Sequence, residues 1–510
     1  MNKWLQWLRG SASVPTVREE KAIMRSPLGR RLNDNLADLL ALFSMTPDLI
    51  VRRLVIRKTG KQAALVYMEG LVDKKSVNDN VMTPLLEETK ESGELPVTAG
   101  PITKRRDWPA IEAALFDGYS VLFVDGMREA YLICTQGWPQ RAIEDPQLEA
   151  SLKGAHQGFV ETGSQNVALI RRYIPNRELK IKEMNVGLRG RAKVSILYVA
   201  DVVNAEVLRE LETRIGGIDV DAILSSGELA EYIEDNPYSP FPQFISTERP
   251  DAASSHLLQG RIAMIVDRSP SVLIGPVTFS SFFQSVDDYG TRWLIASFLR
   301  LLRFLGFIVA IMLPAVYIAV ISFNYEIIPL DLLISLGESR ERVPFPPIIE
   351  ALVMEITLEM LREAGIRLPT PIGQTVGIVG GIVIGQAAVQ AGIVSNMMVI
   401  IVASTAIASF ILPSYDMASA IRLLRFPMMI VASMFGIVGI AVGLMTLIGH
   451  LIALESLGTP YGSPFAPVRL ADWKDMLIRL PLWQMKRRPA ETRAKQRDRS
   501  GSYEPGGGSR

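Results

Sequence analysis

The feature that most constrains this chain is a set of long stretches without a charged side chain. Residues 304–325, 368–415 and 426–454 contain no Asp, Glu, Lys or Arg over 22, 48 and 29 positions. A helix needs about 20 predominantly apolar residues to cross the hydrocarbon core of a bilayer. We therefore expect an all-α transmembrane domain in the C-terminal part of the chain. Buried core helices of a large soluble protein are the alternative.

The transmembrane domain is expected over residues 296–455. The first and third stretches each have room for one membrane-spanning helix, and the middle stretch has room for two. Four spans are predicted, at 304–325, 373–393, 397–413 and 427–453. Residues 346–364 predict an amphipathic or re-entrant helix that two prolines open.

The region before the first span has the texture of a soluble protein, with charges distributed throughout. Short β-branched runs alternate there with segments of helical spacing, which predicts an α/β fold. We expect two subdomains, at 35–150 and 151–295, after a variable segment at 1–34. Strands are predicted at Val51–Arg57, Ala64–Met68, Val121–Val124, Ala130–Cys134, Lys193–Ala200, Ala222–Leu224, Ile262–Val266 and Ser271–Ile274.

Basic residues on both flanks of the transmembrane domain predict its orientation. Arg292, Arg300 and Arg303 precede the first span, and the tail at 456–510 is basic and expected to be partly disordered. Because Lys and Arg accumulate on the cytoplasmic side, both terminal regions are expected in the cytoplasm. Arg422 and Arg425 then fall in an outward loop, against that rule.

Several classes of function are disfavoured by composition. One Cys and three widely separated His argue against a disulfide framework and against a metal site. A formal net charge of +1 gives no support for nucleic-acid binding. The chain contains no phosphate loop, zinc-protease motif or nucleophile elbow. We expect no catalytic residue, no cofactor and no enzymatic activity.

Small residues follow one face of the predicted helix at 376–394. They occupy an arc of about 80° on a helical wheel. The helix-packing candidates are Gly377, Gly381, Gly385, Ala388 and Gly392. Stripes of this kind let membrane helices approach one another closely.

Other faces of the same helix carry two amides four residues apart, which are costly to expose to lipid. The candidate pore-lining residues are Val376, Val379, Val383, Gln386 and Gln390. One interpretation is a helix that lines a pore or cavity. The other is an ordinary packed helix whose Gln side chains bond to neighbouring helices.

One carboxylate lies on the apolar side of the amphipathic helix. Glu350 shares that side with aliphatic residues, whereas Glu355, Glu359 and Glu363 form a polar arc. A buried acid in a membrane must pair, protonate or meet water, and is a functional candidate. If the helix lies at the interface, Glu350 merely complements the helix N-terminus.

Several stretches resemble one protein family, the A subunits of the GerA-type spore germinant receptors. The resemblance spans roughly residues 35–450. The stretches that carry it are Tyr67–Lys74 (YMEGLVDK), Leu169–Val186, Ser239–Asp251 (SPFPQFISTERPD), Leu257–Asp267, Phe282–Tyr289 (FFQSVDDY), Val343–Gly365, Leu368–Ser395 and Ile421–Phe426 (IRLLRF).

The resemblance implies a place in the inner membrane of the endospore. It implies a transporter-like, nutrient-binding B subunit and a lipoprotein C subunit as partners. It also implies a homo-oligomer that opens a cation path when a nutrient binds. A stage V sporulation AF-type accessory protein and a non-conducting scaffold are alternatives. A secondary transporter is disfavoured because no paired inverted half-repeats are found.

Overall fold

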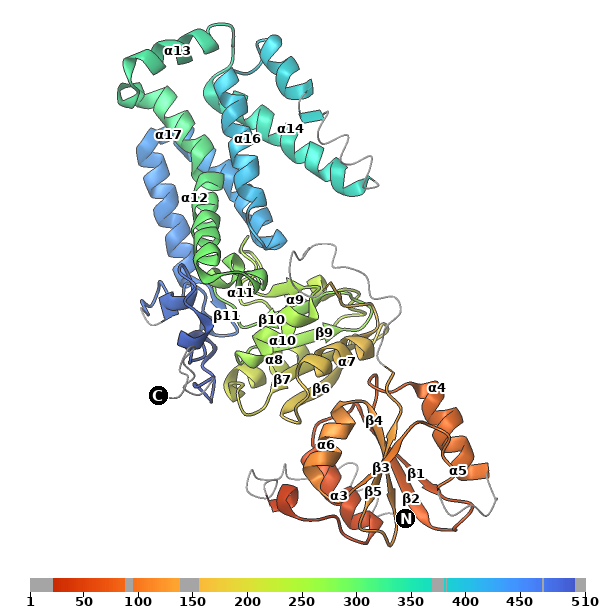
Figure 1. Cartoon of the computed structure of the whole chain (residues 1–510). Coiled ribbons are helices and arrows are strands. Elements are labelled where there is room, and N and C mark those ends of the chain that lie inside the picture. The colour runs from red at the N-terminus through yellow and green to blue at the C-terminus, as the bar shows by residue number, and fades with distance from the viewer. Residues whose placement is uncertain are drawn as a thin grey trace. The chain divides into compact units, whose positions relative to one another are not determined.

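The computed structural model describes residues 22–87, 95–137, 156–368, 380–381, 383–469 and 472–499. The chain divides into two compact units (Figure 1). The first comprises residues 1–233, 246–276 and 488–498, and the second comprises residues 234–245, 277–487 and 499–510. An α/β region with two antiparallel sheets is followed by a helical part, which confirms the predicted fold class. The predicted domain boundaries stay predictions.

The first sheet has the order β1-β2-β4-β5-β3, and every neighbouring pair is antiparallel. Its strands and helices are β1 (Leu49–Val55), β2 (Gln62–Met68), β3 (Ile102–Arg105), β4 (Tyr119–Val124), β5 (Ala130–Cys134), α3 (Leu32–Leu42), α4 (Lys74–Ser76), α5 (Thr83–Glu87) and α6 (Trp108–Phe116). Strands β2 and β4 bury nearly all of their side chains, so apolar cores lie on both faces of the sheet.

The second sheet has the order β6-β7-β9-β10-β8. Its strands and helices are β6 (Leu179–Val186), β7 (Ala192–Val199), β8 (Ile245–Thr247), β9 (Ile262–Val266), β10 (Val272–Gly275), α7 (Gly163–Tyr173), α8 (Ala205–Gly216), α9 (Ser226–Ile233) and α10 (Pro250–Leu258). Seven of the predicted strands overlap observed ones. The strand predicted at Ala222–Leu224 is wrong, because that segment is irregular; the carbonyl of Asp221, just before it, accepts the backbone N–H groups of Arg189 and Gly190.

Helices dominate the second unit. They are α11 (Asp287–Gly290), α12 (Trp293–Phe323), α13 (Leu330–Arg340), α14 (Pro347–Arg367), α16 (Asn396–Phe410) and α17 (Tyr415–Ala453). A short hairpin, β11 (Glu455–Ser456) and β12 (Thr459–Pro460), follows α17. Within the described residues, α12 and α17 are long and apolar enough to cross a bilayer, and α16 is apolar but shorter.

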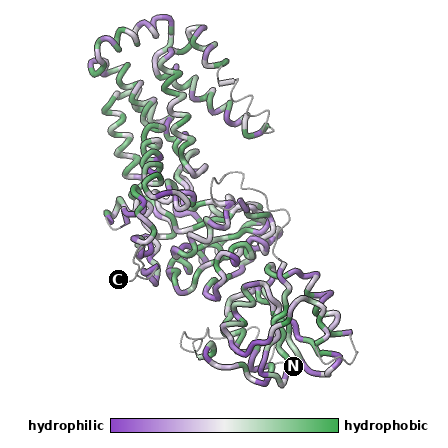
Figure 2. The backbone as a smooth tube through the Cα atoms, in the orientation of Figure 1, coloured by the Kyte–Doolittle hydropathy of each residue, from purple (hydrophilic) through white to green (hydrophobic). Residues whose placement is uncertain are grey.

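Helices α12 and α17 are hydrophobic along much of their length (Figure 2), and much of their apolar surface is uncovered. Only 44% and 33% of their most apolar 18-residue windows are buried. Large side chains such as Phe298, Leu305, Val438 and Met445 are exposed. A core helix of a soluble protein would bury such residues, so these helices favour contact with lipid or with further protein.

Helix α17 reverses direction at Gly436. Its φ of 60° and ψ of −139° lie in a region that is accessible only to glycine. A β-carbon on Gly439 would collide with the carbonyl oxygen of Val431, and one on Gly443 would lie 2.8 Å from the sulfur of Met428. In a straight helix, residues eight and fifteen apart are separated by about 12 and 22 Å. The two halves of α17 are therefore packed against each other. The span predicted at 427–453 contains this reversal.

The chain before α12 is tied to the C-terminal segment by ionic contacts. Arg300 donates to Asp288 at 3.0 Å and to Asp475 at 2.9 Å, and Arg303 donates to Asp288 at 2.8 Å. The hydroxyl of Tyr289 donates to Asp475 at 2.8 Å. Burial, together with the Asp475 carboxylate, raises the pKa of Tyr289. Two of the arginines that predict a cytoplasmic flank are thus also structural partners of the buried Asp288.

Candidate functional site

Glu350 is completely buried at the start of α14. One of its carboxylate oxygens lies 3.0 Å from a guanidinium nitrogen of Arg340. The other accepts the backbone N–H of Ser395, the N-cap residue of α16, at 2.9 Å. Unpaired N–H groups at a helix start favour a negative charge. Of the outcomes that the sequence leaves open for this carboxylate, the structure shows pairing.

A second buried carboxylate, Glu355, lies further along α14. It pairs with Arg425 of α17, and both side chains are 1% exposed. The hydroxyl of Thr405, on α16, donates to the same carboxylate at 3.3 Å. Breaking such a pair by removing one partner is strongly unfavourable, because the other charge stays buried. Glu355 and Arg425 therefore hold α14 and α17 together.

Sequence reasoning missed this pair. The helical wheel places Glu355 with the polar residues, and the predicted topology places Arg425 in an outward loop. Instead, Arg425 lies inside α17, next to the apolar run. The available signal was the conflict between Arg425 and the expected charge distribution of loops. An arginine that violates the positive-inside rule is a candidate for a buried partner.

A partly exposed ionic group continues along the same helices. The Glu359 carboxylate lies 3.6 Å from Arg362 and 3.3 Å from Arg422. The Arg362 guanidinium also lies over the ring of Phe410, 4.7 Å from its centroid. Glu355 and Glu359, one turn apart on α14, thus both lie against arginines of neighbouring turns, from α14 and α17.

The candidate pore-lining residues fall partly within the described structure. Val376 and Val379 lie outside the described residues. Val383, Gln386 and Gln390 are exposed on a helical segment at 383–390. At 100° per residue these three positions share one face of that segment. The amides therefore face away from the chain's own helices.

The helix-packing candidates behave differently from one another. Gly377 lies outside the described residues, and Ala388 is half-buried. Gly385 is buried, and a β-carbon there would lie 3.7 Å from Val399 of α16. No atom would lie within 4 Å of a β-carbon at Gly381. Gly392, at φ +68°, ends the helical segment, where a β-carbon would lie 2.9 Å from the Arg342 carbonyl oxygen. Among the described glycines of this candidate set, Gly385 is the one whose β-carbon would lie within 4 Å of a neighbouring helix.

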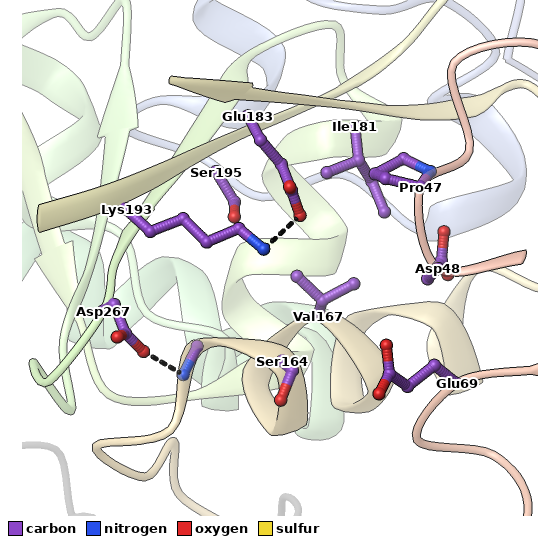
Figure 3. A pocket seen from close by; sticks show the side chains of 11 residues that line it. Pro47, Asp48, Glu69, Ser164, Val167, Ile181, Glu183, Lys193, Ser195 and Asp267 are labelled. Carbon is purple, nitrogen blue, oxygen red and sulfur yellow. Dashed lines mark hydrogen bonds and ion pairs between the residues drawn. The ribbon is translucent and has the colours of Figure 1, made fainter. Parts of the chain in front are cut away.

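The first unit contains a cavity of about 240 Å³ beside α7 (Figure 3). Residues from both sheet regions line it: Pro47, Asp48, Glu69, Gly163, Ser164, Val167, Ile181, Glu183, Lys193, Ser195 and Asp267. Lys193 lies 2.7 Å from Glu183, and the Gly163 N–H donates to Asp267 at 3.0 Å. Asp48 pairs with Arg171, and Glu69 pairs with Lys74. Charges of both signs in a small space suit a small polar ligand, which would compete with these pairs.

The described lining residues of this cavity include no nucleophile paired with a base. Ser164 and Ser195 in the cavity wall have no His among its lining residues to activate them. Across the described ranges, no group of three or more His, Cys, Asp or Glu is placed to hold a metal ion.

Comparison with known proteins decides the family. The family model described as Bacillus/Clostridium GerA spore germination protein matches residues 37–491. The chain belongs to the GerA spore germination protein family. The match includes both sheets and the helical part with its buried ion pairs.

Curated relatives of this GerA-family chain match over nearly their whole length. It is 40% identical to spore germination protein KA of Bacillus subtilis (strain 168), covering 95% of this chain and 90% of that protein. It is also 40% identical to the uncharacterized membrane protein YfkQ of the same strain, covering 91% of both chains. That relative's name and the two apolar helices support a membrane protein.

Among solved structures, a match is found to the N-terminal domain of the A subunit of the Bacillus megaterium spore germinant receptor GerK3. The two are 29% identical, with a TM-score of 0.39. The match covers 50% of this chain and 98% of the GerK3 domain.

Proposed function

We propose that this GerA-family chain is the membrane subunit of a spore germinant receptor that oligomerises into a nutrient-gated cation channel. It would act in the inner membrane of the endospore with a transporter-like B subunit and a lipoprotein C subunit. Both terminal regions would lie in the cytoplasm. Opening the channel would release cations at the start of germination.

One observation carries the channel proposal. Gln386 and Gln390 are exposed on the same face as Val383, while Gly385 on the opposite side packs against α16. Two amides facing hydrocarbon would each lack hydrogen-bond partners, at a cost of several kcal/mol. Water in a pore or groups from another subunit would satisfy them. In a ring of copies with this face turned toward the symmetry axis, water would fill the space on the axis and neighbouring subunits would cover the sides of the helix.

Cysteine labelling tests which groups cover this face. The single native cysteine, Cys134, is first replaced by serine. Single cysteines at 383, 386 and 390 in the full chain should react with a charged, membrane-impermeant thiol reagent. A cysteine at Ala388, which is half-buried toward the opposite face, is the matched control. Equal reactivity at all four positions would contradict a water-lined face.

Ion flux distinguishes a channel from a scaffold. The purified full chain in potassium-loaded liposomes should release potassium faster after Val383→Ser, because a hydroxyl weakens an apolar constriction. Ser404→Ala, at a half-buried position of α16, should leave the flux unchanged. If neither the native chain nor the Val383→Ser variant releases potassium although the chain is oligomeric, the non-conducting scaffold is the better description.

A further inference from the structure

Helix α12 carries a proline in its buried interior. Pro314 has no N–H, so the carbonyl of Ala310, four residues earlier, loses its helical hydrogen-bond partner. Both residues are buried within α12. A buried carbonyl without a partner is unfavourable, so this oxygen needs another donor.

Arg425 supplies that donor. Its Nε donates to the carbonyl oxygen of Ala310 at 2.8 Å. A second nitrogen of the same guanidinium, Nη1, pairs with Glu355 of α14. One buried side chain of α17 therefore completes the broken hydrogen-bond ladder of α12 and neutralises the acid on α14.

Helix α14 is held by both apolar and ionic contacts, since Ile348, Leu352, Met354 and Leu358 are partly buried against the apolar cluster around Ala351. Its buried residues are Pro347, Glu350, Ala351 and Glu355, so two of the four are carboxylates held by arginines. The apolar residues Val353, Ile356 and Met360 are exposed. The chain leaves α14 at Arg367 and leads to the segment with the candidate pore-lining residues. A displacement of α14 would thus separate Glu350 and Glu355 from their arginines as well as uncover apolar side chains.

We propose that Arg425 is a positioning residue that couples α14 to the break in α12 at Pro314. While Glu355 holds Arg425 in place, the guanidinium caps the Ala310 carbonyl and fixes the direction of α12 beyond the proline. When α14 moves and Glu355 withdraws, Arg425 follows its carboxylate. The freed carbonyl then lets α12 bend. This inference rests on the proposed function only in linking that movement to conduction.

Distances along α12 test the coupling without any ligand. Spin labels are attached at Leu305 and Phe323, two exposed positions on either side of Pro314, in the full chain with Cys134→Ser. Pulsed electron paramagnetic resonance gives the distance distribution. Combining Glu355→Met with Arg425→Met removes both buried charges together and should broaden that distribution. Adding Pro314→Ala restores the N–H that bonds to Ala310 and should narrow it again.

A neighbouring arginine provides the matched control. Arg422 lies one turn before Arg425 on α17 and pairs with Glu359 of α14. Arg422→Met should leave the 305–323 distance unchanged. If the Glu355→Met, Arg425→Met variant has the same 305–323 distance distribution as the native chain, the proposed coupling is wrong. It is also wrong if the distribution broadens and Pro314→Ala does not narrow it. This rescue separates positioning from general loss of structure, because a misfolded chain gains nothing from one helical hydrogen bond.

Potassium efflux from liposomes distinguishes failure of this inference from failure of the proposed function. If the native chain conducts, the Glu355→Met, Arg425→Met variant should alter the efflux, and Pro314→Ala should reverse the change. Unaltered efflux would overturn the link to conduction. If the native chain does not conduct, the channel proposal fails, and the distance measurement still decides whether Arg425 fixes α12.

Discussion

Arg171 holds Asp48 with two parallel hydrogen bonds, each 3.1 Å long, from Nε and Nη2. Arg171 lies on α7 of the second sheet region, and Asp48 immediately precedes β1 of the first. The arginine side chain is fully buried. Its remaining nitrogen, Nη1, donates to the carbonyl of Leu179 at 2.9 Å. One side chain thus connects the two sheet regions beside the cavity that Asp48 lines.

Replacing Arg171 by Met should destabilise the first unit by about 3–5 kcal/mol, because Asp48 would stay largely buried without its partner. Chemical denaturation of the full chain in detergent, followed by tryptophan fluorescence, measures the change. Arg172→Met is the matched control, since Arg172 is exposed. Similar midpoints for the two variants would show that the ion pair contributes little.

Replacing Gly436 by Ala should disrupt the reversal of α17. The φ and ψ of Gly436 lie where a β-carbon costs about 1–3 kcal/mol, and Phe323 would lie 3.0 Å from that carbon. We expect less folded protein in membranes, measured by limited proteolysis. Gly449→Ala, in the open second half of the same helix, should be neutral. If both variants resist proteolysis equally, the backbone at Gly436 tolerates a side chain.

Leucine at Gly385 and at Gly381 should have different consequences. At Gly385 the side chain would press on Val399 within the same chain, so the folded monomer should become less stable. At Gly381 nothing lies within 4 Å, so the monomer should tolerate Leu. If Gly381 packs against another copy, Gly381→Leu should shift the complex to a smaller size in detergent. An unchanged size would remove Gly381 from the subunit contact.

The soluble region should lose stability in acid through His256. Burial, followed by the positive charge of Arg261, lowers the pKa of His256 to about 3. The unfolded chain, with an ordinary value of 6.5, therefore binds more protons between pH 6.5 and 3. The contribution of this group to stability is complete above pH 6.5 and declines as the pH falls through that window.

Hydrogen exchange of the β9 amides measures this effect in the full chain. Protection should fall more between pH 7.5 and pH 5 in the native chain than in His256→Gln. Glutamine removes the titration while keeping an acceptor for Arg261, which donates to the ring at 3.1 Å. Parallel losses of protection in the two proteins would show that His256 does not control the acid response.

The helical wheel identified Glu350 as unusual, and it is buried and paired. The same method gave the wrong environment for Glu355, because a wheel reports only the side of one helix. Whether that side faces water or an arginine depends on the neighbouring helix. Predicting what Arg425 bonds to on α12 requires knowing that the carbonyl of Ala310 lies beside it, over a hundred positions earlier in the chain.

The sequence alone determined the division into a charged α/β region and an apolar helical part, because hydrophobicity and its period are local properties. It also determined the family, through motifs distributed along the chain. Only the tertiary structure decided that α17 turns back at Gly436 and that Arg425 caps Ala310 while pairing with Glu355. Glycine's freedom permits a turn without specifying one. A charge or an orphan carbonyl acquires its partner only when separate helices pack together.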